Sequence, residues 1–305
     1  MIQLISLTHN QKPMTINANE LLELDAPSPE PIWGPGFCTR NLTMVYGTRG
    51  VAKTRWAMKL AHTIAAGGKF LCWAVGDPRR VLYIDGELGL PSLRNRYRAI
   101  EAEAALSPEG DFFRVLSKDH CGHQLWNISN PKDQAKYDAA IGNAEVVIFD
   151  NLLSCMFPMD GKDDEVAQWR RVAPWLFHLR EAGKLVILIH HTGKSGEQLG
   201  SSVKENFLDT CILLKKCQVE RNIDGCEFDF IWTKTRDVKK SEAPNLHIEL
   251  LDDDEGTPRW YWSSLGEERE QSIKNMKSMG ISKRDAAREL NLTLLEVSKL
   301  WGSDE

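Results

Sequence analysis

The residues best suited to chemistry lie in one short segment, Gly47-Thr48-Arg49-Gly50-Val51-Ala52-Lys53-Thr54, which Arg55 follows. Glycines in such a turn let successive backbone N–H groups converge on phosphate oxygens, and a helix that begins there adds positive potential. Lys53 would then reach the β- and γ-phosphates of a nucleotide, and the Thr54 hydroxyl would hold Mg²⁺. The segment therefore predicts a phosphate-binding loop.

The flanking residues support this interpretation. Residues 42–46 form a short apolar run typical of a buried strand, and residues 55–65 have helical spacing. Strand, glycine-rich turn, Lys-Thr and helix is the arrangement of a P-loop, whereas an ordinary strand-to-helix turn does not require the lysine and threonine.

Ala52 departs from the common pattern, which has glycine immediately before the lysine. Alanine is the smallest substitute, but it does not adopt left-handed backbone geometry cheaply. We expect nucleotide binding to survive this change and hydrolysis to be the more sensitive of the two.

Acidic residues follow two further apolar runs. Residues 81–84 lead into Asp85-Gly86-Glu87, and residues 146–149 lead into Asp150. In an open α/β sheet, the C-terminal ends of the strands are where ligands bind. Glu87 would orient and deprotonate an attacking water, or alternatively cap the following helix. Asp150 would accept a hydrogen bond from Thr54 or from a Mg²⁺-bound water.

A histidine pair follows another predicted strand, residues 184–189. His190 and His191 are either sensors of the γ-phosphate or satisfied polar residues at a strand end. The Gly/Lys/Ser loop that comes next, which contains Lys194, supports the interpretation of this pair as sensors.

Composition limits the class of protein. The chain has 305 residues and a net charge of −5, which argues against a globally basic nucleic-acid binder but allows a local basic channel. No apolar run approaches the roughly 18 residues of a membrane span, and we expect no signal peptide. The seven cysteines form no C-x-x-C pair, which indicates reduced thiols in a cytoplasmic protein.

Several segments carry weaker expectations. Four prolines between residues 27 and 35 argue against regular structure there, and residues 106–131 are expected to be mostly loop. Residues 152–162 are predicted to form a mobile loop above the sheet. Arg94, Arg96 and Arg98 share a helix whose basic face is expected to be solvated surface, with a subunit contact as the alternative. Residues 227–262 are predicted to form a β-rich end.

The tail changes character after Gly266. Three helical segments are predicted, at about 267–279, 282–290 and 293–301. Their spacing, with Ala286 and Ala287 where helices cross, is typical of a helix-turn-helix. The expected second helix is not basic, so duplex DNA contact and a helical hairpin for protein contacts both stay open.

Taken in order, these motifs resemble the RecA-type ATPases, and most closely the RepA-like hexameric helicases of plasmids and phages. The resemblance covers roughly residues 30–262, and its most specific part is His190-His191-Thr192-Gly193-Lys194 with Gly200-Ser201-Ser202. It implies an ATP- and Mg²⁺-dependent enzyme that forms a homo-oligomer, usually a hexamer.

The resemblance also implies roles for individual residues. Glu87 matches the catalytic glutamate, Asp150 the Walker B aspartate, and His190 or His191 the sensor. Lys234 and Arg236 match a pair that reaches into the ATP site of the neighbouring subunit. Loops 152–163 and 192–205 match those that face single-stranded DNA, where Lys194 and Lys204 would contact phosphates.

We therefore expect an α/β fold: a RecA-like P-loop core with a mostly parallel sheet, antiparallel C-terminal strands and a small helical tail. The expected division is a lead-in at 1–30, an ATPase domain at 31–264 and a helix-turn-helix-like domain at 265–305. The expected function is an ATP-dependent DNA helicase or translocase acting in replication of a mobile element. The alternative is an ATP-switched DNA-binding regulator or loader that unwinds nothing.

Overall fold

The computed structural model describes residues 15–159, 164–192, 206–217, 225–236, 238–253, 255–290, 292 and 294–301. Its helices are α1 (Ala18–Glu23), α2 (Lys53–Ala66), α3 (Leu90–Glu103), α4 (Pro131–Ile141), α5 (Leu152–Cys155), α6 (Glu165–Glu181), α8 (Leu265–Ser278), α9 (Lys283–Glu289) and α10 (Leu294–Leu300), with 3₁₀ turns η1 (Lys118–Cys121) and η2 (Lys240–Glu242). Its strands are β1 (Pro31–Trp33), β2 (Phe37–Cys38), β3 (Asn41–Gly47), β4 (Gly68–Phe70), β5 (Trp73–Val75), β6 (Val81–Asp85), β7 (Phe113–Ser117), β8 (Val146–Asp150), β9 (Leu185–His191), β10 (Thr210–Lys216), β11 (Cys226–Thr235), β12 (Leu246–Asp252) and β13 (Pro258–Ser264).

The main sheet has two halves. Its strand order is β13-β12-β11-β10-β3-β9-β8-β6-β7. The strands from β10 to β7 pair in parallel, whereas β10 to β13 pair antiparallel. The expected fold class, a RecA-like α/β core with a mostly parallel sheet, antiparallel C-terminal strands and C-terminal helices, is confirmed.

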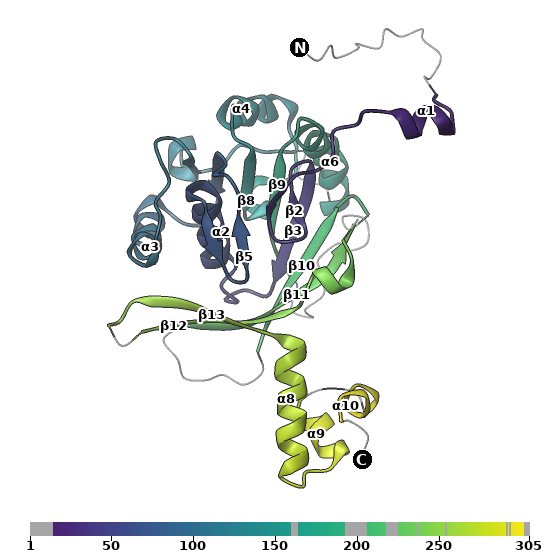
Figure 1. Cartoon of the computed structure of the whole chain (residues 1–305). Helices are drawn as coiled ribbons and strands as arrows, with labels where there is room; N and C mark the ends of the chain where they lie inside the picture. Colours follow the sequence, from purple (N-terminus) through teal and green to yellow (C-terminus); the bar gives the residue numbers. More distant parts are fainter. Residues whose placement is uncertain are drawn as a thin grey trace.

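Helices cover both faces of the parallel half (Figure 1). On one face α2 and α3 pack against alternate side chains such as Val45, Ile148 and Ile187. On the other face, α4, α5 and α6 pack against the strand residues next to these in the sequence, such as Met44 and Phe149. Successive strand residues point to opposite faces, so these central strands are apolar throughout and can be recognised from sequence.

The C-terminal helices have a hydrophobic cluster of their own. Ile273 of α8, Ala286 and Ala287 of α9, and Val297 of α10 are buried together with Trp301. This group lies beyond β13, away from the parallel half of the sheet (Figure 1). The three predicted helical segments are confirmed with shifts of one to two residues in most bounds.

Two local expectations are wrong. The proline-rich stretch contains β1, which joins β2, β4 and β5 in a second, four-stranded sheet. This sheet is anchored by Trp33, which is 1% exposed. Residues 106–131, by contrast, are mostly loop as expected, and their one strand, β7, is an edge strand paired with β6. The start of the supposed mobile loop is helix α5, with Cys155 and Met156 buried in the core, while residues 160–163 lie outside the described residues.

Candidate functional site

The predicted phosphate-binding loop connects β3 to α2. Gly47 ends β3 so close to β10 that a Cβ there would collide with the Leu214 carbonyl oxygen. Gly50 has a φ of +81°, a left-handed conformation that glycine adopts without steric cost. Helix α2 begins at Lys53, which places its N-terminus at the loop.

Ala52 adopts the geometry that glycine would normally supply. Its φ is 71° and its ψ is 20°, in the left-handed region, although alanine prefers other geometry. The closed turn therefore tolerates the Cβ, and the loop takes its shape with a small strain stored at this residue.

Lys53 lies folded over the loop. Its Nζ donates to the carbonyl oxygens of Gly47 at 2.8 Å and Thr48 at 2.7 Å. The side chain is buried, and this burial lowers the pKa of Lys53 to about 8, against the opposing effect of the carboxylates of Asp150 and Glu87. Nearby phosphate charges would favour the protonated amine.

Asp150 lies at the end of β8, fully buried between two hydroxyls. It accepts hydrogen bonds from Tyr83 at 2.5 Å and from Thr54. Burial raises the pKa of Asp150, and the nearby Glu87 carboxylate adds to this, while the two hydrogen bonds oppose it. The predicted contact between Thr54 and Asp150 is thus present.

Glu87 follows β6 and faces two polar side chains from neighbouring strands. Its Oε2 accepts from Asn151 Nδ2 at 2.8 Å and lies 3.3 Å from His191 Nε2. Burial alone would raise the pKa of Glu87, but these two hydrogen bonds and the charges of His191 and Lys53 together outweigh it and lower the pKa. Glu87 does not cap α3, whose N-cap is Gly89, so the capping alternative is wrong.

The two histidines point to opposite faces of β9. His191 lies beside Glu87 and Asn151, and burial together with the charge of Lys53 lowers the pKa of His191. His190 is fully buried on the other face, with its Nε2 3.8 Å from Glu165 Oε1 of α6. Of the pair, only His191 is therefore in contact with the Glu87 cluster.

A cavity of about 270 Å³ joins these parts. It is lined by Gly50, Ala52, Lys53, Thr54, Arg55, Glu87, Leu88, Arg96, His191, Gly225 and Cys226. Asp85 borders the same strand ends, and burial raises its pKa to about 7, with Asp150 adding to the effect. Val51 is buried behind the loop, whereas Arg49 is exposed at its tip.

Lys234 and Arg236 do not reach this cavity. Arg236 Nη1 lies 3.5 Å from Asp209 Oδ1, and its Nη2 donates to the Asn206 carbonyl at 2.8 Å. Asp209 also accepts from the backbone N–H of Leu42 at 2.9 Å, at the start of β3, whereas the phosphate-binding loop follows the end of that strand. Lys234 lines a separate cavity beside α8. Lys194 and Lys204, and Gly200-Ser201-Ser202, lie outside the described residues.

Several residues of the site were not singled out in the sequence, among them Asn151 and Arg96. Asn151 bridges Glu87 and His191, and its position directly after Asp150 was the available signal. Arg96 was assigned to solvated surface, but it is half-buried and lines the cavity. Its position nine residues after Glu87, on the helix that leaves the site, carried no distinctive pattern.

The residues present fit a nucleotide with a divalent cation. Asp85 Oδ2 is buried, and no described residue donates a hydrogen bond to it. Together with Glu87 and Asp150 it concentrates negative charge beside the loop, which a cation would neutralise. Lys53, the open position at Gly50 and the helix N-terminus would meet phosphate oxygens.

Comparison with known protein families agrees with this geometry. The model of a family described as an AAA domain matches residues 9–197. The chain belongs to this AAA domain family. Its core is thus that of a RecA-like P-loop ATPase, a fold that binds nucleotide. A search of curated proteins finds no match.

Solved structures with a similar fold are distant in sequence from this AAA domain. The RadB recombinase is 16% identical, with a TM-score of 0.49 over 72% of this chain and 91% of its own. A KaiC-like protein from Pyrococcus horikoshii is 16% identical, with a TM-score of 0.48 over 74% and 91%. The flagellar accessory protein FlaH from Methanocaldococcus jannaschii is 10% identical, with a TM-score of 0.49 over 75% and 91%. Within the described residues, no helix is long and apolar enough to cross a membrane.

Proposed function

We propose that the chain is an ATP-hydrolysing, oligomeric DNA helicase or translocase of the RepA type, acting in replication of a mobile element. The observation that carries the hydrolytic part is the position of Glu87. Its carboxylate is held by Asn151 and His191 and borders the cavity that Lys53 and Thr54 also line. A regulator that only binds nucleotide would not need an ionised carboxylate oriented there.

Each residue has a distinct role in this proposal. Glu87 is ionised at neutral pH, as its lowered pKa requires, and it orients the attacking water and accepts its proton. Lys53 exchanges the loop carbonyls for phosphate oxygens of ATP. Thr54 and Asp150 would hold Mg²⁺. When bound, this ion would neutralise part of the negative charge of the phosphates. His191 senses whether the γ-phosphate is present through its contact with Glu87.

The oligomeric part rests on Lys234 and Arg236. Both lie away from the phosphate-binding loop of their own chain, and the Arg236 side chain is 46% exposed. An exposed guanidinium at that place is available to a neighbouring subunit, where it would stabilise charge on the transferring phosphoryl group. We propose a ring of six, with single-stranded DNA contacted by Lys194 and Lys204.

The C-terminal helices favour a second candidate, an ATP-switched DNA-binding regulator or loader. We propose residues 265–305 as a separate helix-turn-helix-like domain, after a lead-in at 1–30 and an ATPase domain at 31–264. Helices α9 and α10 pack through Ala286, Ala287 and Val297, and Ser282 caps α9. In this alternative the helices bind duplex DNA and ATP controls assembly.

The deciding experiment measures ATP hydrolysis by purified protein with and without single-stranded DNA, together with its mass in ATP and strand displacement on a forked duplex. Turnover stimulated by single strands, in a ring-sized assembly that separates strands, supports the motor. DNA-indifferent turnover in a monomer or dimer that binds duplex without unwinding it supports the regulator. Glu87→Gln, which should bind ATP without turnover, controls for contaminating enzymes.

A further inference from the structure

A group of metal-binding donor atoms lies in the antiparallel half of the sheet, away from the nucleotide cavity. Cys217 directly follows β10, Glu227 and Asp229 belong to β11, and His247 belongs to β12. Phe228 and Ile248, their neighbours in sequence, are buried in the core. Because side chains alternate along a strand, the donors of β11 and β12 gather on the face opposite that core.

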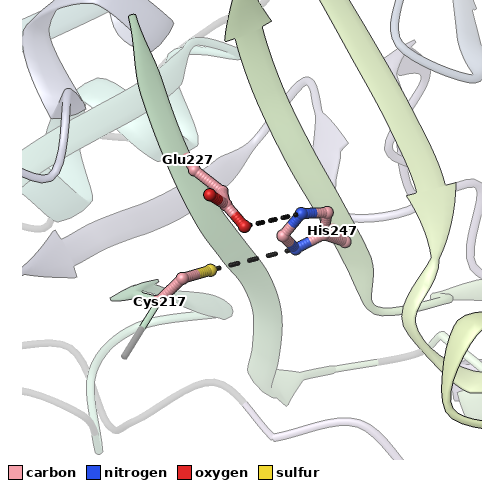
Figure 2. A group of neighbouring side chains, drawn as sticks. All are labelled: Cys217, Glu227 and His247. Atoms are coloured by element: carbon pink, nitrogen blue, oxygen red, sulfur yellow. Dashed lines mark hydrogen bonds and ion pairs between the residues drawn. The ribbon is translucent and has the colours of Figure 1, made fainter. Parts of the chain in front are cut away.

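The donors converge on one imidazole. Figure 2 shows Cys217 and Glu227 approaching His247 from two sides, and the ligand atoms of these three residues all lie within 4.8 Å of one another. Asp229 is paired directly with His247 across the two strands and brings a fourth donor.

Three of the atoms are spaced as ligands of one cation. Asp229 Oδ1 lies 3.1 Å from His247 Nδ1, and Cys217 Sγ lies 3.9 Å from that nitrogen and 3.8 Å from that oxygen. Bonds of about 2.0–2.3 Å to a tetrahedral zinc place neighbouring ligand atoms roughly 3.3–3.6 Å apart. Shifts of a few tenths of an ångström would complete three corners of such a site.

Glu227 contacts the opposite side of the His247 ring. Its Oε1 lies 3.3 Å from Nε2, the other nitrogen of His247. Histidines that bind a metal usually donate their second N–H to a carboxylate, which fixes the ring and its tautomer. Glu227 is placed for this, with Nδ1 left to face Cys217 and Asp229.

We propose that Cys217, Asp229 and His247 bind one zinc-class divalent cation, oriented by Glu227, and that the ion joins strands β10, β11 and β12. Mixed sulfur, nitrogen and oxygen donors suit Zn²⁺ and Co²⁺ rather than Mg²⁺, which prefers oxygen. The carboxylates are mostly buried, with side chains 12% and 17% exposed, so one imidazolium would leave part of their charge uncompensated. The thiol would bind as thiolate and release its proton to water. This site is independent of the proposed ATPase function.

The test uses tag-free, full-length protein without nucleotide, treated with a chelator and then titrated with Zn²⁺ by calorimetry and with Co²⁺ by absorption. One ion per chain and a sulfur-to-cobalt charge-transfer band are expected. Cys217→Ser should abolish the band, whereas Glu227→Gln should keep it and weaken affinity by about tenfold or more. Circular dichroism checks that each variant is folded.

Cys121→Ser is the matched control. Cys121 is another half-buried thiol with histidines near it in sequence, but His123 beside it is exposed and pairs with Asp119 at 3.7 Å. This variant should bind like the parent. Folded parent protein that binds neither ion would overturn the proposal and leave His247 as a hydrogen-bond partner of the two carboxylates. Equal binding by Cys217→Ser would overturn it as well.

Discussion

The two halves of the main sheet organise polar residues in different ways. In the parallel half, β3, β6, β8 and β9 all end at the same edge, so Lys53, Glu87 and His191 line one cavity, and Asp150 is hydrogen-bonded to Thr54 of its lining. In the antiparallel half, successive strands run in opposite directions, and Arg236 ends up near the start of β3. A parallel sheet thus assembles a site within one chain, whereas we propose that the antiparallel half presents Arg236 to a neighbouring subunit.

The largest expected effect tests whether Arg236 of the antiparallel half acts in the site of a neighbouring subunit. If it completes the site of a neighbouring subunit, Arg236→Ala should lower ATP turnover by about a thousandfold or more without unfolding the chain. Arg180→Ala is the matched control, because the Arg180 guanidinium lies at the same 3.5 Å from Asp209 Oδ1. Equal losses in both variants would mean that Arg236 serves only its pair with Asp209.

Mixing inactive variants distinguishes a neighbour's site from the chain's own. Lys53→Ala keeps Arg236 but loses the phosphate-binding lysine, and Arg236→Ala does the reverse. A mixed assembly contains interfaces with both residues intact, so partial turnover should return. No recovery in assemblies proved to be mixed would contradict a shared site.

A substitution of Glu87 tests the site at the end of the parallel strands. Glu87→Gln removes the ionised carboxylate but keeps the size of the side chain, so turnover should fall by about a hundredfold or more, with nucleotide affinity nearly unchanged. Calorimetry with ATP and a phosphate-release assay measure the two effects. Glu109→Gln, at an exposed position, is the control. Loss of binding in Glu87→Gln would instead assign Glu87 to holding the loop.

A smaller effect is expected from the titration of Lys53, which should make nucleotide affinity depend on pH. Its pKa in the empty protein is lowered to about 8, and bound phosphates would raise it, so binding above that pH takes up a proton. Nucleotide affinity should therefore be constant below pH 8 and fall about tenfold per unit well above it. Lys53→Arg, whose guanidinium stays charged, should remove this dependence. The same slope in Lys53→Arg would point to another group.

The smallest expected effect is at Ala52. Because its φ is 71°, Ala52→Gly should relieve strain and raise the free energy of unfolding by about 1 kcal/mol in urea denaturation. Ala135→Gly, on the exposed face of α4, should lower it by a similar amount, since glycine disfavours a helix interior. If Ala52→Gly is instead less stable, the packing of the Ala52 Cβ contributes more stability than its strained backbone costs.

Much of the nucleotide site could be predicted because its signals are local. The phosphate-binding loop occupies consecutive residues, and Glu87, Asp150 and His191 each follow an apolar run at a strand end. The P-loop motif and the parallel-strand rule are enough to bring such residues together. The left-handed geometry of Ala52 was not predicted, because it depends on how the whole turn closes between β3 and α2.

Other features are set by contacts between distant segments. Short strands β1 and β5 pair across more than one intervening element, so the second sheet leaves little periodic pattern in the sequence. Arg96 becomes half-buried only because α3 packs beside the phosphate-binding loop. The donor group at Cys217, Asp229 and His247 depends on strand register, which spacing along the chain does not reveal.

The sequence alone determined the P-loop, the strand-end acids and the fold class, since each depends on neighbouring residues and on the alternation of apolar side chains. Only the tertiary structure decided which histidine faces Glu87. His190 and His191 are adjacent, and the period of two along β9 sends one into the core beside Glu165 and the other to the nucleotide cavity. The tertiary structure likewise placed Arg236 away from its own phosphate-binding loop, because β11 runs antiparallel to β10 and carries Arg236 back to Asp209.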